Sequence, residues 1–263
     1  MKNYLDINKD AWNKRTPIHI KSAFYNLENW IKGECSLNSI ELNLLEQVKN
    51  KRILHLQCHF GQDTLSLSRL GAKCTGVDFS TEAINKANEL NTQLNLDANF
   101  ICTDVYSCLD KLDEKFDIVY TSYGTIGWLP DINKWAKIIS KALKPNGKLV
   151  FVEFHPFIWT MDSNLSKIEY SYFNSSAIIE ESSGTYTDNN AEISYKEVGW
   201  NHGLAEVFQA LKKAGLEIKD FNEYNYSPYN CFQNLTEVEK GKFQFTSYKG
   251  MIPMVYSLVA TKV

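Results

Sequence analysis

The chain has 263 residues, of which 44% are hydrophobic and 22% are charged, so it is long enough to bury a sizeable core as one α/β domain with insertions. Its net charge is −3, and no basic block or stripe interrupts the sequence. This balance argues against a nucleic acid as a direct partner and favours small molecules.

The apolar runs and the spacing of the cysteines indicate in which cellular compartment the protein is expected. No apolar run approaches the eighteen or so residues that span a bilayer, and the first residues lack a signal-peptide core. We therefore expect a cytoplasmic protein without membrane contact. The six cysteines have no CxxC spacing, and the five histidines form no metal-binding pattern. Buried reduced thiols are favoured over disulfides, and no metal is expected.

Residues 1–36 precede the first predicted strand and combine charges with aromatic side chains, namely Trp12, His19, Phe24, Tyr25 and Trp30. Two interpretations stay open. The segment is either an N-terminal helix with scattered packing aromatics, or a flap that closes over a ligand and excludes water. After it, Ser36 or Asn38 is expected to cap a helix that runs to about Val48.

The stretch RILHLQCHFG, residues 52–61, predicts a strand followed by a tight turn and a helix. Ile53, Leu54 and Leu56 form an apolar run that suits a buried strand, and a helix is expected from Thr64 to Leu70. Residues 74–77 predict a second strand that ends at Asp78. An acid at this place, about twenty residues after the turn, suits the binding of a ribose.

The same alternation of strands and helices continues to Phe154. Ser80 is expected to cap a helix over 81–95, and Asp131 a helix over 132–143. Strands are expected over 99–103, 116–121 and 148–154, with a turn at 145–147. Such alternation predicts a parallel sheet with ligands bound outside the carboxyl ends of its strands. Four polar residues end strands there: Asp78, Asp104, Ser122 and His155.

From residue 156 onward the regular alternation stops. Short pieces over 156–200 suggest an antiparallel insertion, and 225–253 form a second insertion rich in aromatic residues. Between them a helix is expected over 203–215 and a strand over 217–224. A last strand is expected over 255–262. We expect one domain, 37–263, in which the two insertions cap the sheet.

The turn after the first strand limits the kind of ligand. A dinucleotide needs several glycines there, so that backbone N–H groups can approach a pyrophosphate. This chain has only Gly61, and Gln57 and His59 occupy the two earlier positions. Their side chains would crowd a pyrophosphate, so a ligand without phosphate is favoured.

The motifs LHLQCHFGQDTLS, TGVDFS and TSYGTIGWLPD resemble those of class I S-adenosylmethionine-dependent methyltransferases. The usual first motif is LDLGCGxG, and His55, Gln57 and His59 depart from it. The resemblance implies a Rossmann-like, doubly wound, mostly parallel sheet of seven strands with an antiparallel final hairpin. It implies S-adenosyl-L-methionine as cofactor and S-adenosyl-L-homocysteine as product. It leaves the acceptor open.

The resemblance also implies where the cofactor binds. Asp78 would hold the ribose, and Asp104 and Val105 the adenine amino group, the other interpretation of Asp104 being an ordinary loop carboxylate. Phe79 either covers the adenine face or packs in the core. The methionine end would be lined by the turn and the helix start, with His59 either binding the carboxylate or filling space. This set comprises Gln57, Cys58, His59, Gly61, Gln62 and Asp63, and Ser122 joins it from the fourth strand.

Methyl transfer to a small molecule needs alignment, and a general base only if the acceptor must lose a proton. His155 and His202 are the candidate bases, although each can equally be a satisfied polar residue in a loop. Tyr123 is a candidate for the acceptor pocket. The rival hypotheses are a non-catalytic module that binds the cofactor or its product, and a nicotinamide-dependent oxidoreductase. A monomer or a homodimer is expected.

Overall fold

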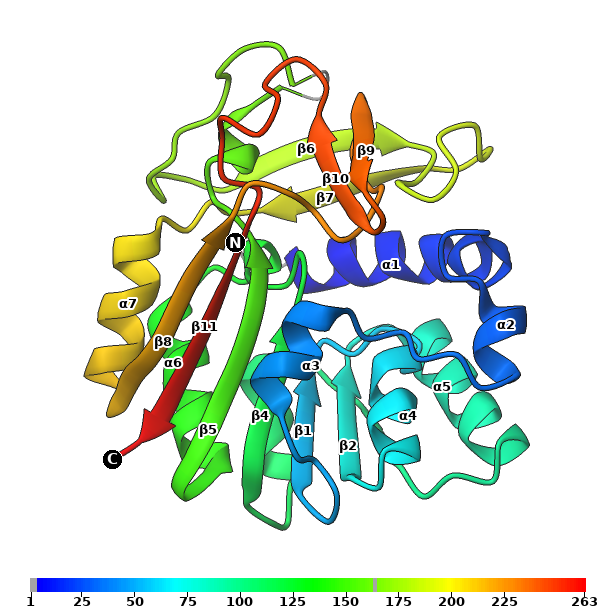
Figure 1. Ribbon diagram of the computed structural model, residues 1–263, viewed down its shortest axis with the longest axis vertical. Coiled ribbons are helices and arrows are strands. Elements are labelled where there is room, and N and C mark those ends of the chain that lie inside the picture. Colours follow the sequence, from blue (N-terminus) through cyan, green and yellow to red (C-terminus); the bar gives the residue numbers. More distant parts are fainter. Residues whose placement is uncertain (1–3, 163–164) are drawn as a thin grey trace.

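A computed structural model describes residues 4–162 and 165–263. Its central element is a seven-stranded sheet with strand order β3-β2-β1-β4-β5-β11-β8. β1 to β5 are parallel, and β11 runs antiparallel to both β5 and β8 (Figure 1). The strands are β1 (Arg52–Leu56), β2 (Lys73–Asp78), β3 (Asn99–Cys102), β4 (Phe116–Ser122), β5 (Leu143–Phe154), β8 (Leu216–Tyr224) and β11 (Val255–Lys262). The predicted fold class, including the antiparallel final hairpin, is confirmed.

Helices cover both faces of this sheet because neighbouring residues of each strand point to opposite sides. Ile53 packs with the helices α3 (Ser39–Leu45) and α4 (Gln62–Arg69). Leu54 packs on the other face, in the cluster that holds α6 (Ile132–Ala142) and α7 (Leu204–Lys213). α5 (Thr81–Gln93) packs beside α4. Three short 3-10 helices follow strands: η1 (Val105–Lys111), η2 (Ile126–Trp128) and η3 (Ile158–Thr160).

Side-chain caps fix where several helices begin. The Ser80 side chain accepts from the backbone N–H of Ala83, and Asp131 accepts from that of Lys134, as the sequence predicts. Asn38 caps α3 in a capping box with Glu41, but the helix ends at Leu45, earlier than expected.

The predicted turn at 145–147 lies inside β5. β5 pairs with β4 at Leu143 and again from Lys148, and the residues between them form an irregularity in the register. The predicted strand began too late because β5 already pairs with β4 at Leu143, before the turn.

A cap lies over the carboxyl ends of the parallel strands. It contains the antiparallel pair β6 (Ile178–Ser183) and β7 (Ser194–Gly199), and the antiparallel pair β9 (Leu235–Glu239) and β10 (Lys242–Phe245). The long helix α1 (Tyr4–Lys21) passes between the sheet and β7, and α2 (Leu27–Ile31) follows it (Figure 1). Residues 1–3 of the expected flap and 163–164 of the first insertion lie outside the described residues.

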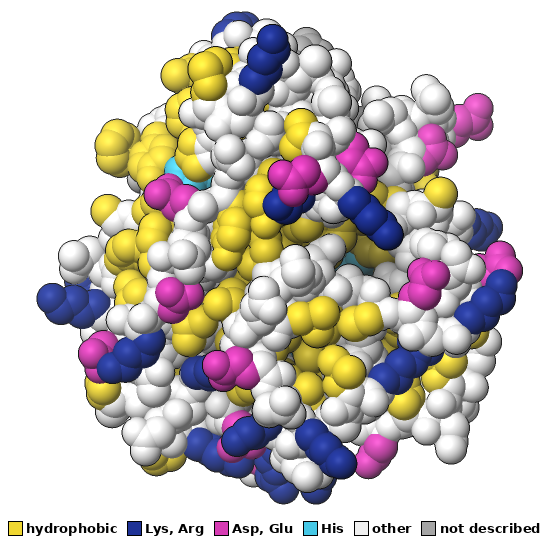
Figure 2. Space-filling model, in the orientation of Figure 1, with side chains coloured by type: hydrophobic (Ala, Val, Ile, Leu, Met, Phe, Trp, Pro, Cys, Tyr) yellow, Lys and Arg dark blue, Asp and Glu magenta, His cyan; other side chains and the backbone are white. Residues whose placement is uncertain are grey.

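The surface shows the junction between cap and sheet. Hydrophobic side chains gather along this junction in Figure 2, and most charged side chains lie toward the periphery and the lower pole. None of the described helices combines the length and the apolar character that a membrane span requires.

Candidate functional site

The turn between β1 and α4 has an unusual backbone. Gln57, His59 and Gly61 all have positive φ angles, of 56°, 52° and 76°. These are the three positions where the resembling motif has glycine. Only Gly61 is sterically required, because a Cβ there would lie 2.6 Å from the Phe100 ring. Gln57 and His59 adopt the left-handed region at a cost of order 1–3 kcal/mol each, so the chain retains the glycine-type turn without its glycines.

Asp78 lies at the end of β2, directly beside this turn. Its Oδ2 accepts from the backbone N–H of His59 at 2.9 Å, and its Oδ1 accepts from that of Ser80 at 2.8 Å. Burial raises the pKa of the carboxyl to about 6, although these hydrogen bonds act in the opposite direction. Each oxygen keeps a second lone pair, so the carboxylate can accept from two further hydroxyl groups.

Helix α1 covers Asp78 and the turn. The Asn13 Oδ1 accepts from the Ser80 hydroxyl at 2.8 Å, which fixes α1 to the start of α5. The Nδ1 of His19 lies 2.9 Å from the Nε2 of His59, so one imidazole donates to the other. Burial lowers the pKa of His19 to about 2 and that of His59 to about 3, so both rings are neutral at pH 7.

Between α1 and the turn, several buried polar atoms have no hydrogen-bond partner among residues 4–162 and 165–263. They are Trp12 Nε1, Arg15 Nε, His19 Nε2, Gln57 Oε1 and His59 Nδ1. Unpaired buried polar atoms are costly, and a ligand with both donors and acceptors would satisfy them. Of these residues, His59 contacts both Asp78 and His19 of α1.

The residues expected at the adenine end lie one strand further along. The Asp104 side chain accepts from the backbone N–H of Tyr106 at 2.8 Å and so caps η1. Val105 is buried, and Phe79 is partly exposed next to Asp78. The carbonyl oxygen of Phe79 accepts from the Cys102 thiol. Asp104 therefore has a local structural role, and its binding of adenine stays a prediction.

The residues expected at the methionine end are held by the surrounding loops. Gln57 Nε2 donates to the Thr125 carbonyl at 2.8 Å, and Gln62 Nε2 donates to the Tyr25 carbonyl at 2.8 Å. The Cys58 thiol is buried and contacts the His59 carbonyl. Asp63, in the first turn of α4, is partly buried, and burial raises the pKa of its carboxyl. These contacts join the turn to the segment after β4, and α4 to the segment between α1 and α2.

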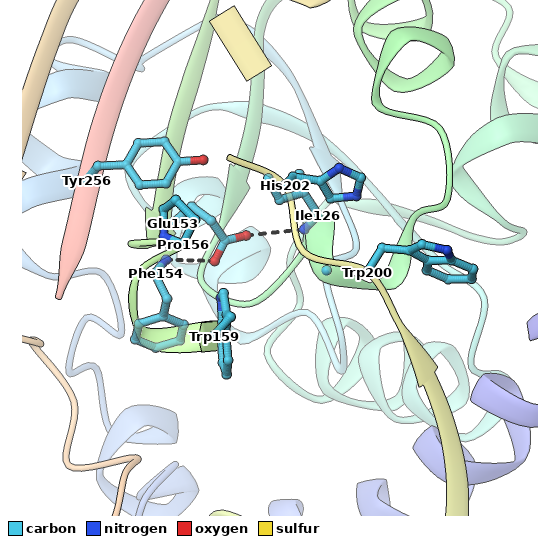
Figure 3. Close-up of a pocket in the computed structure, with 9 residues that line it drawn as sticks. Ile126, Glu153, Phe154, Pro156, Trp159, Trp200, His202 and Tyr256 are labelled. Carbon is cyan, nitrogen blue, oxygen red and sulfur yellow. Dashed lines mark hydrogen bonds between the residues drawn. The ribbon is translucent and has the colours of Figure 1, made fainter. Parts of the chain in front are cut away.

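Glu153, near the end of β5, organises the loop after β4. Its Oε2 accepts from the Thr125 N–H at 2.7 Å, the Thr125 hydroxyl at 2.9 Å and the Ile126 N–H at 3.2 Å. Its Oε1 accepts from the Phe154 N–H at 2.7 Å (Figure 3). The same oxygen accepts from the Gly124 N–H. Beside it lies a cavity of about 10 Å³, room for a single water at most. Glu153 is thus a positioning residue for the loop that begins at Ser122.

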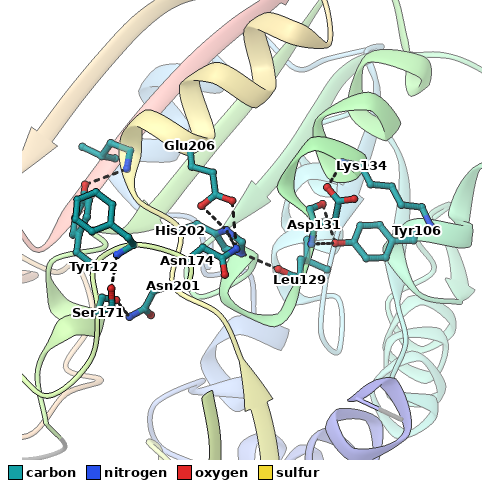
Figure 4. A network of polar contacts seen from close by, with 12 residues as sticks. Tyr106, Leu129, Asp131, Lys134, Ser171, Tyr172, Asn174, Asn201, His202 and Glu206 are labelled. Atoms are coloured by element: carbon teal, nitrogen blue, oxygen red, sulfur yellow. Dashed lines mark hydrogen bonds and ion pairs between the residues drawn. The ribbon is translucent and has the colours of Figure 1, made fainter. Parts of the chain in front are cut away.

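The two candidate bases both have protein partners. His202 is buried, with Nε2 donating to the Leu129 carbonyl at 2.7 Å and Nδ1 lying 3.1 Å from Glu206 Oε2 (Figure 4). His155 Nε2 lies 2.9 Å from Glu223 Oε1, and its Nδ1 accepts from the Phe157 N–H. In both rings each nitrogen is engaged, so the geometry favours the interpretation as satisfied polar residues. Their role as bases stays a prediction.

Tyr123 lies at the end of β4 with a φ of 48°. Its hydroxyl donates to Glu41 Oε2 at 3.0 Å, and its ring contacts those of Phe154 and Tyr229. Ser122 precedes it and is partly buried. The structure therefore brings Tyr123 together with a carboxylate from α3 that the sequence patterns did not single out.

Helix α1 carries two residues that sequence reasoning missed, Asn8 and Arg15. With Trp12 and His19, which the sequence analysis named, they are spaced four, three and four residues apart, so they lie on one face of the helix. Asn8 exchanges two hydrogen bonds of 2.8 Å with the backbone of Val198, and Arg15 pairs with Glu197 of β7. This helical spacing of polar residues was the available signal.

Comparison with known proteins agrees with this arrangement. Residues 53–147 match a family model described as a methyltransferase domain. The match covers only this part of the chain. β1, the turn and Asp78 fall within the matched residues, whereas α1 and the cap lie outside them.

The relatives of the methyltransferase domain are distant. The ubiquinone biosynthesis O-methyltransferase of Coxiella burnetii is 30% identical over 154 residues, which are 56% of this chain and 58% of that protein. An S-adenosylmethionine-dependent methyltransferase structure from Mesorhizobium loti has a TM-score of 0.58 at 20% identity and covers 88% of this chain and 100% of that one. One from Clostridium acetobutylicum has a TM-score of 0.57 at 17% identity and covers 97% and 98%. At these identities the structures share the fold.

Proposed function

We propose that the protein transfers a methyl group from S-adenosylmethionine to a small-molecule acceptor. The observation that carries this proposal is the turn with positive φ at Gln57, His59 and Gly61, placed against the buried carboxylate of Asp78. A nucleoside without phosphate fits there, because the side chains of Gln57 and His59 leave no approach for a pyrophosphate. The match of residues 53–147 to a methyltransferase domain supports the same reaction.

Each residue of the site has a proposed task. Asp78 accepts hydrogen bonds from the ribose hydroxyls, and Asp104 and Val105 hold the adenine. The turn and the start of α4 bind the amino-acid end of the cofactor, with the unpaired atoms of Gln57 and His59 as its partners. When bound, the cofactor supplies a methyl group on a positively charged sulfur. The protein then has to align the acceptor and exclude water, and α1 together with the cap serves the second purpose.

Residues 1–36 act as a flap in this proposal. Asn13 and His19 bind the sheet side of the site, and Asn8 and Arg15 bind β7 of the cap. A helix held on both sides closes the space over the turn. We still expect the protein to be cytoplasmic and to be a monomer or a homodimer.

Two assays separate this function from its rivals. We expect S-adenosylhomocysteine to raise the melting temperature of the protein and NAD to leave it unchanged, because only a ligand that binds the folded state stabilises it. Radiolabelled S-adenosylmethionine is then incubated with the protein and a metabolite mixture. Transfer of label supports the proposal. Tight binding with no transfer supports the binding module, and stabilisation by NAD alone supports the oxidoreductase.

A further inference from the structure

Beside the turn lies a group of acids and tyrosines, of which the proposed function has used only Asp63 at the start of α4. This acid–tyrosine cluster consists of Glu41, Asp63, Tyr120, Tyr123 and Tyr229. Glu41 is 0% exposed although it carries a carboxylate. Its Oε1 accepts from the Asn38 backbone at 3.3 Å and side chain at 3.2 Å, and its Oε2 accepts from Tyr123. All of these partners are neutral.

The cluster holds two carboxylates and no cation. Among residues 4–162 and 165–263, neither Glu41 nor Asp63 pairs with a lysine, an arginine or a histidine. Burial, and after it the charge of Asp63, raise the pKa of Glu41 to about 7. A buried carboxylate normally requires a charged or strongly donating partner, so a partner from outside the chain would relieve this arrangement.

A further buried polar group of the cluster lacks a partner. The Tyr120 side chain is 0% exposed, and its hydroxyl makes no hydrogen bond to any described residue. Burial, and after it the charges of Glu41 and Asp63, raise the pKa of this phenol. Its oxygen can accept a hydrogen bond from a donor.

Aromatic rings form the remaining wall. The rings of Tyr123 and Tyr229 are 5.0 Å apart, and Tyr229 stacks on Phe24 at 5.5 Å. The faces of such rings attract cations, which adds to the attraction of the two carboxylates. The elements that supply the cluster are α3, α4, the end of β4 and the second insertion, so it lies between the cofactor turn and the cap.

We propose that the acid–tyrosine cluster binds the ammonium group of the methyl acceptor, which makes the acceptor an organic amine. This inference rests on the proposed function and specifies its substrate class. An ammonium has several donors and no acceptor, which complements carboxylates, a free phenol oxygen and ring faces. A phenol or an alcohol would leave both charges of the cluster uncompensated.

The transfer step balances with these residues. The bound ammonium gives a proton to the Glu41 carboxylate and becomes a neutral amine. Its nitrogen lone pair forms the bond to the methyl carbon, and the electron pair of the broken carbon–sulfur bond stays on sulfur. The product is a methylated ammonium, whose charge the cluster again compensates. Glu41 in this step is both the binding carboxylate and the base.

Calorimetry at pH 8 with saturating S-adenosylhomocysteine tests the inference. The probes are ethylammonium, butylammonium and benzylammonium, each compared with the alcohol of the same carbon skeleton, together with catechol. We expect at least one amine to bind roughly tenfold or more tightly than its alcohol, because a charge-assisted hydrogen bond is lost in the alcohol. Glu41→Gln and Asp63→Asn should each weaken that amine by about tenfold or more.

The variants have matched controls. Gln at position 41 can still complete the capping box of α3, so the fold is kept. Glu46→Gln removes a carboxylate from the end of the same helix, where Glu46 is 72% exposed and pairs with Lys148, and should leave amine binding unchanged.

The outcomes separate this inference from the proposed function. Failure of S-adenosylhomocysteine to bind the wild type overturns the proposed function itself. If S-adenosylhomocysteine binds but the protein shows no preference for amines over alcohols, or prefers catechol, only the amine inference is overturned. A tenfold loss of S-adenosylhomocysteine binding in both acid variants also overturns it, because the cluster would then hold the amino group of the cofactor.

Discussion

The sheet with its flanking helices and the cover formed by α1, α2 and the two hairpins of the cap are held by different interactions. In the sheet, fully buried apolar residues such as Leu54, Val119 and Leu149 belong to continuous buried runs along the strands. In α1, the buried residues are Asn8, Ala11, Arg15, Thr16 and His19, and only one of them is apolar. Apolar burial stabilises the sheet regardless of ligand, whereas the polar contacts of the cover can open and close. The core of the sheet therefore determines the stability of the protein, whereas the cover determines access to the site.

The largest expected effect comes from the core of the sheet. Phe151 is fully buried and contacts the rings of Trp135 and Tyr256. Phe151→Ala should lower the free energy of unfolding by about 3–5 kcal/mol, because it leaves a cavity. Urea denaturation measures this. In the cap, Phe173 is 75% exposed, and Phe173→Ala should change the free energy by less than about 0.5 kcal/mol. Equal losses in both variants would contradict the comparison.

Acid should release α1 before it unfolds the sheet. The pKa values of His19 and His59 are lowered to about 2 and about 3, whereas an unfolded histidine titrates near 6.5. The unfolded state therefore binds more protons between these values, and stability is lost as pH falls below 6.5. At pH 5 the loss is about 2 kcal/mol per histidine.

Detachment of α1 relieves this loss without unfolding the sheet. Hydrogen exchange should therefore show α1 amides exchanging faster at pH 5 than at pH 7, after correction for the intrinsic rate. Exchange in β1, which carries the buried His55, should require more acid or global unfolding. His19→Asn should reduce the pH effect on α1. Uniform loss of protection in α1 and β1 would argue against separate units.

The next effect concerns the site between the two regions. Asp78→Ala should weaken binding of S-adenosylhomocysteine by roughly 1–3 kcal/mol, because the ribose hydroxyls lose a charged acceptor. Calorimetry on the folded variant measures it. Asp97→Ala, at an exposed position after α5, is the control and should bind normally. Unchanged affinity in the Asp78 variant would remove the ribose assignment.

The smallest effect should be confined to the cover. Asn8→Ala leaves the N–H and the carbonyl of Val198 without their side-chain partner, which should favour opening of α1 by about 1–2 kcal/mol. Faster amide exchange in α1 measures this opening. Asp10→Ala, on the exposed face of the same helix, removes only a surface ion pair with Lys14 and should cost less than about 0.5 kcal/mol. A reversed order of the two variants would show that the exposed face anchors the helix.

The sequence predicted the sheet better than the cover for a physical reason. Strand alternation and the caps at Ser80 and Asp131 are local features, so the patterns around them were sufficient. The contact of Asn8 with Val198 joins residues 190 positions apart, and no local pattern indicates it. Likewise, the five hydrogen bonds of Glu153 depend on the packing of β5 against the loop after β4.

The site was predicted in part. Asp78 was placed beside the turn from its position after β2, and the structure brings the two together. The positive φ angles of Gln57 and His59 follow from neither residue type, since both normally avoid this conformation. Glu41 was missed because its sequence role, a capping residue of α3, gave no indication of its burial beside Tyr123.

The position of β11 has a consequence for synthesis of the protein. Residues 255–262 are inserted between β5 and β8, both of which leave the ribosome earlier. Until β11 emerges, the nascent chain exposes an unpaired edge of β5 and holds β8 without a neighbour. The sheet can therefore close only after residues 255–262 have emerged, and chaperones that shield strand edges can act on the chain until then.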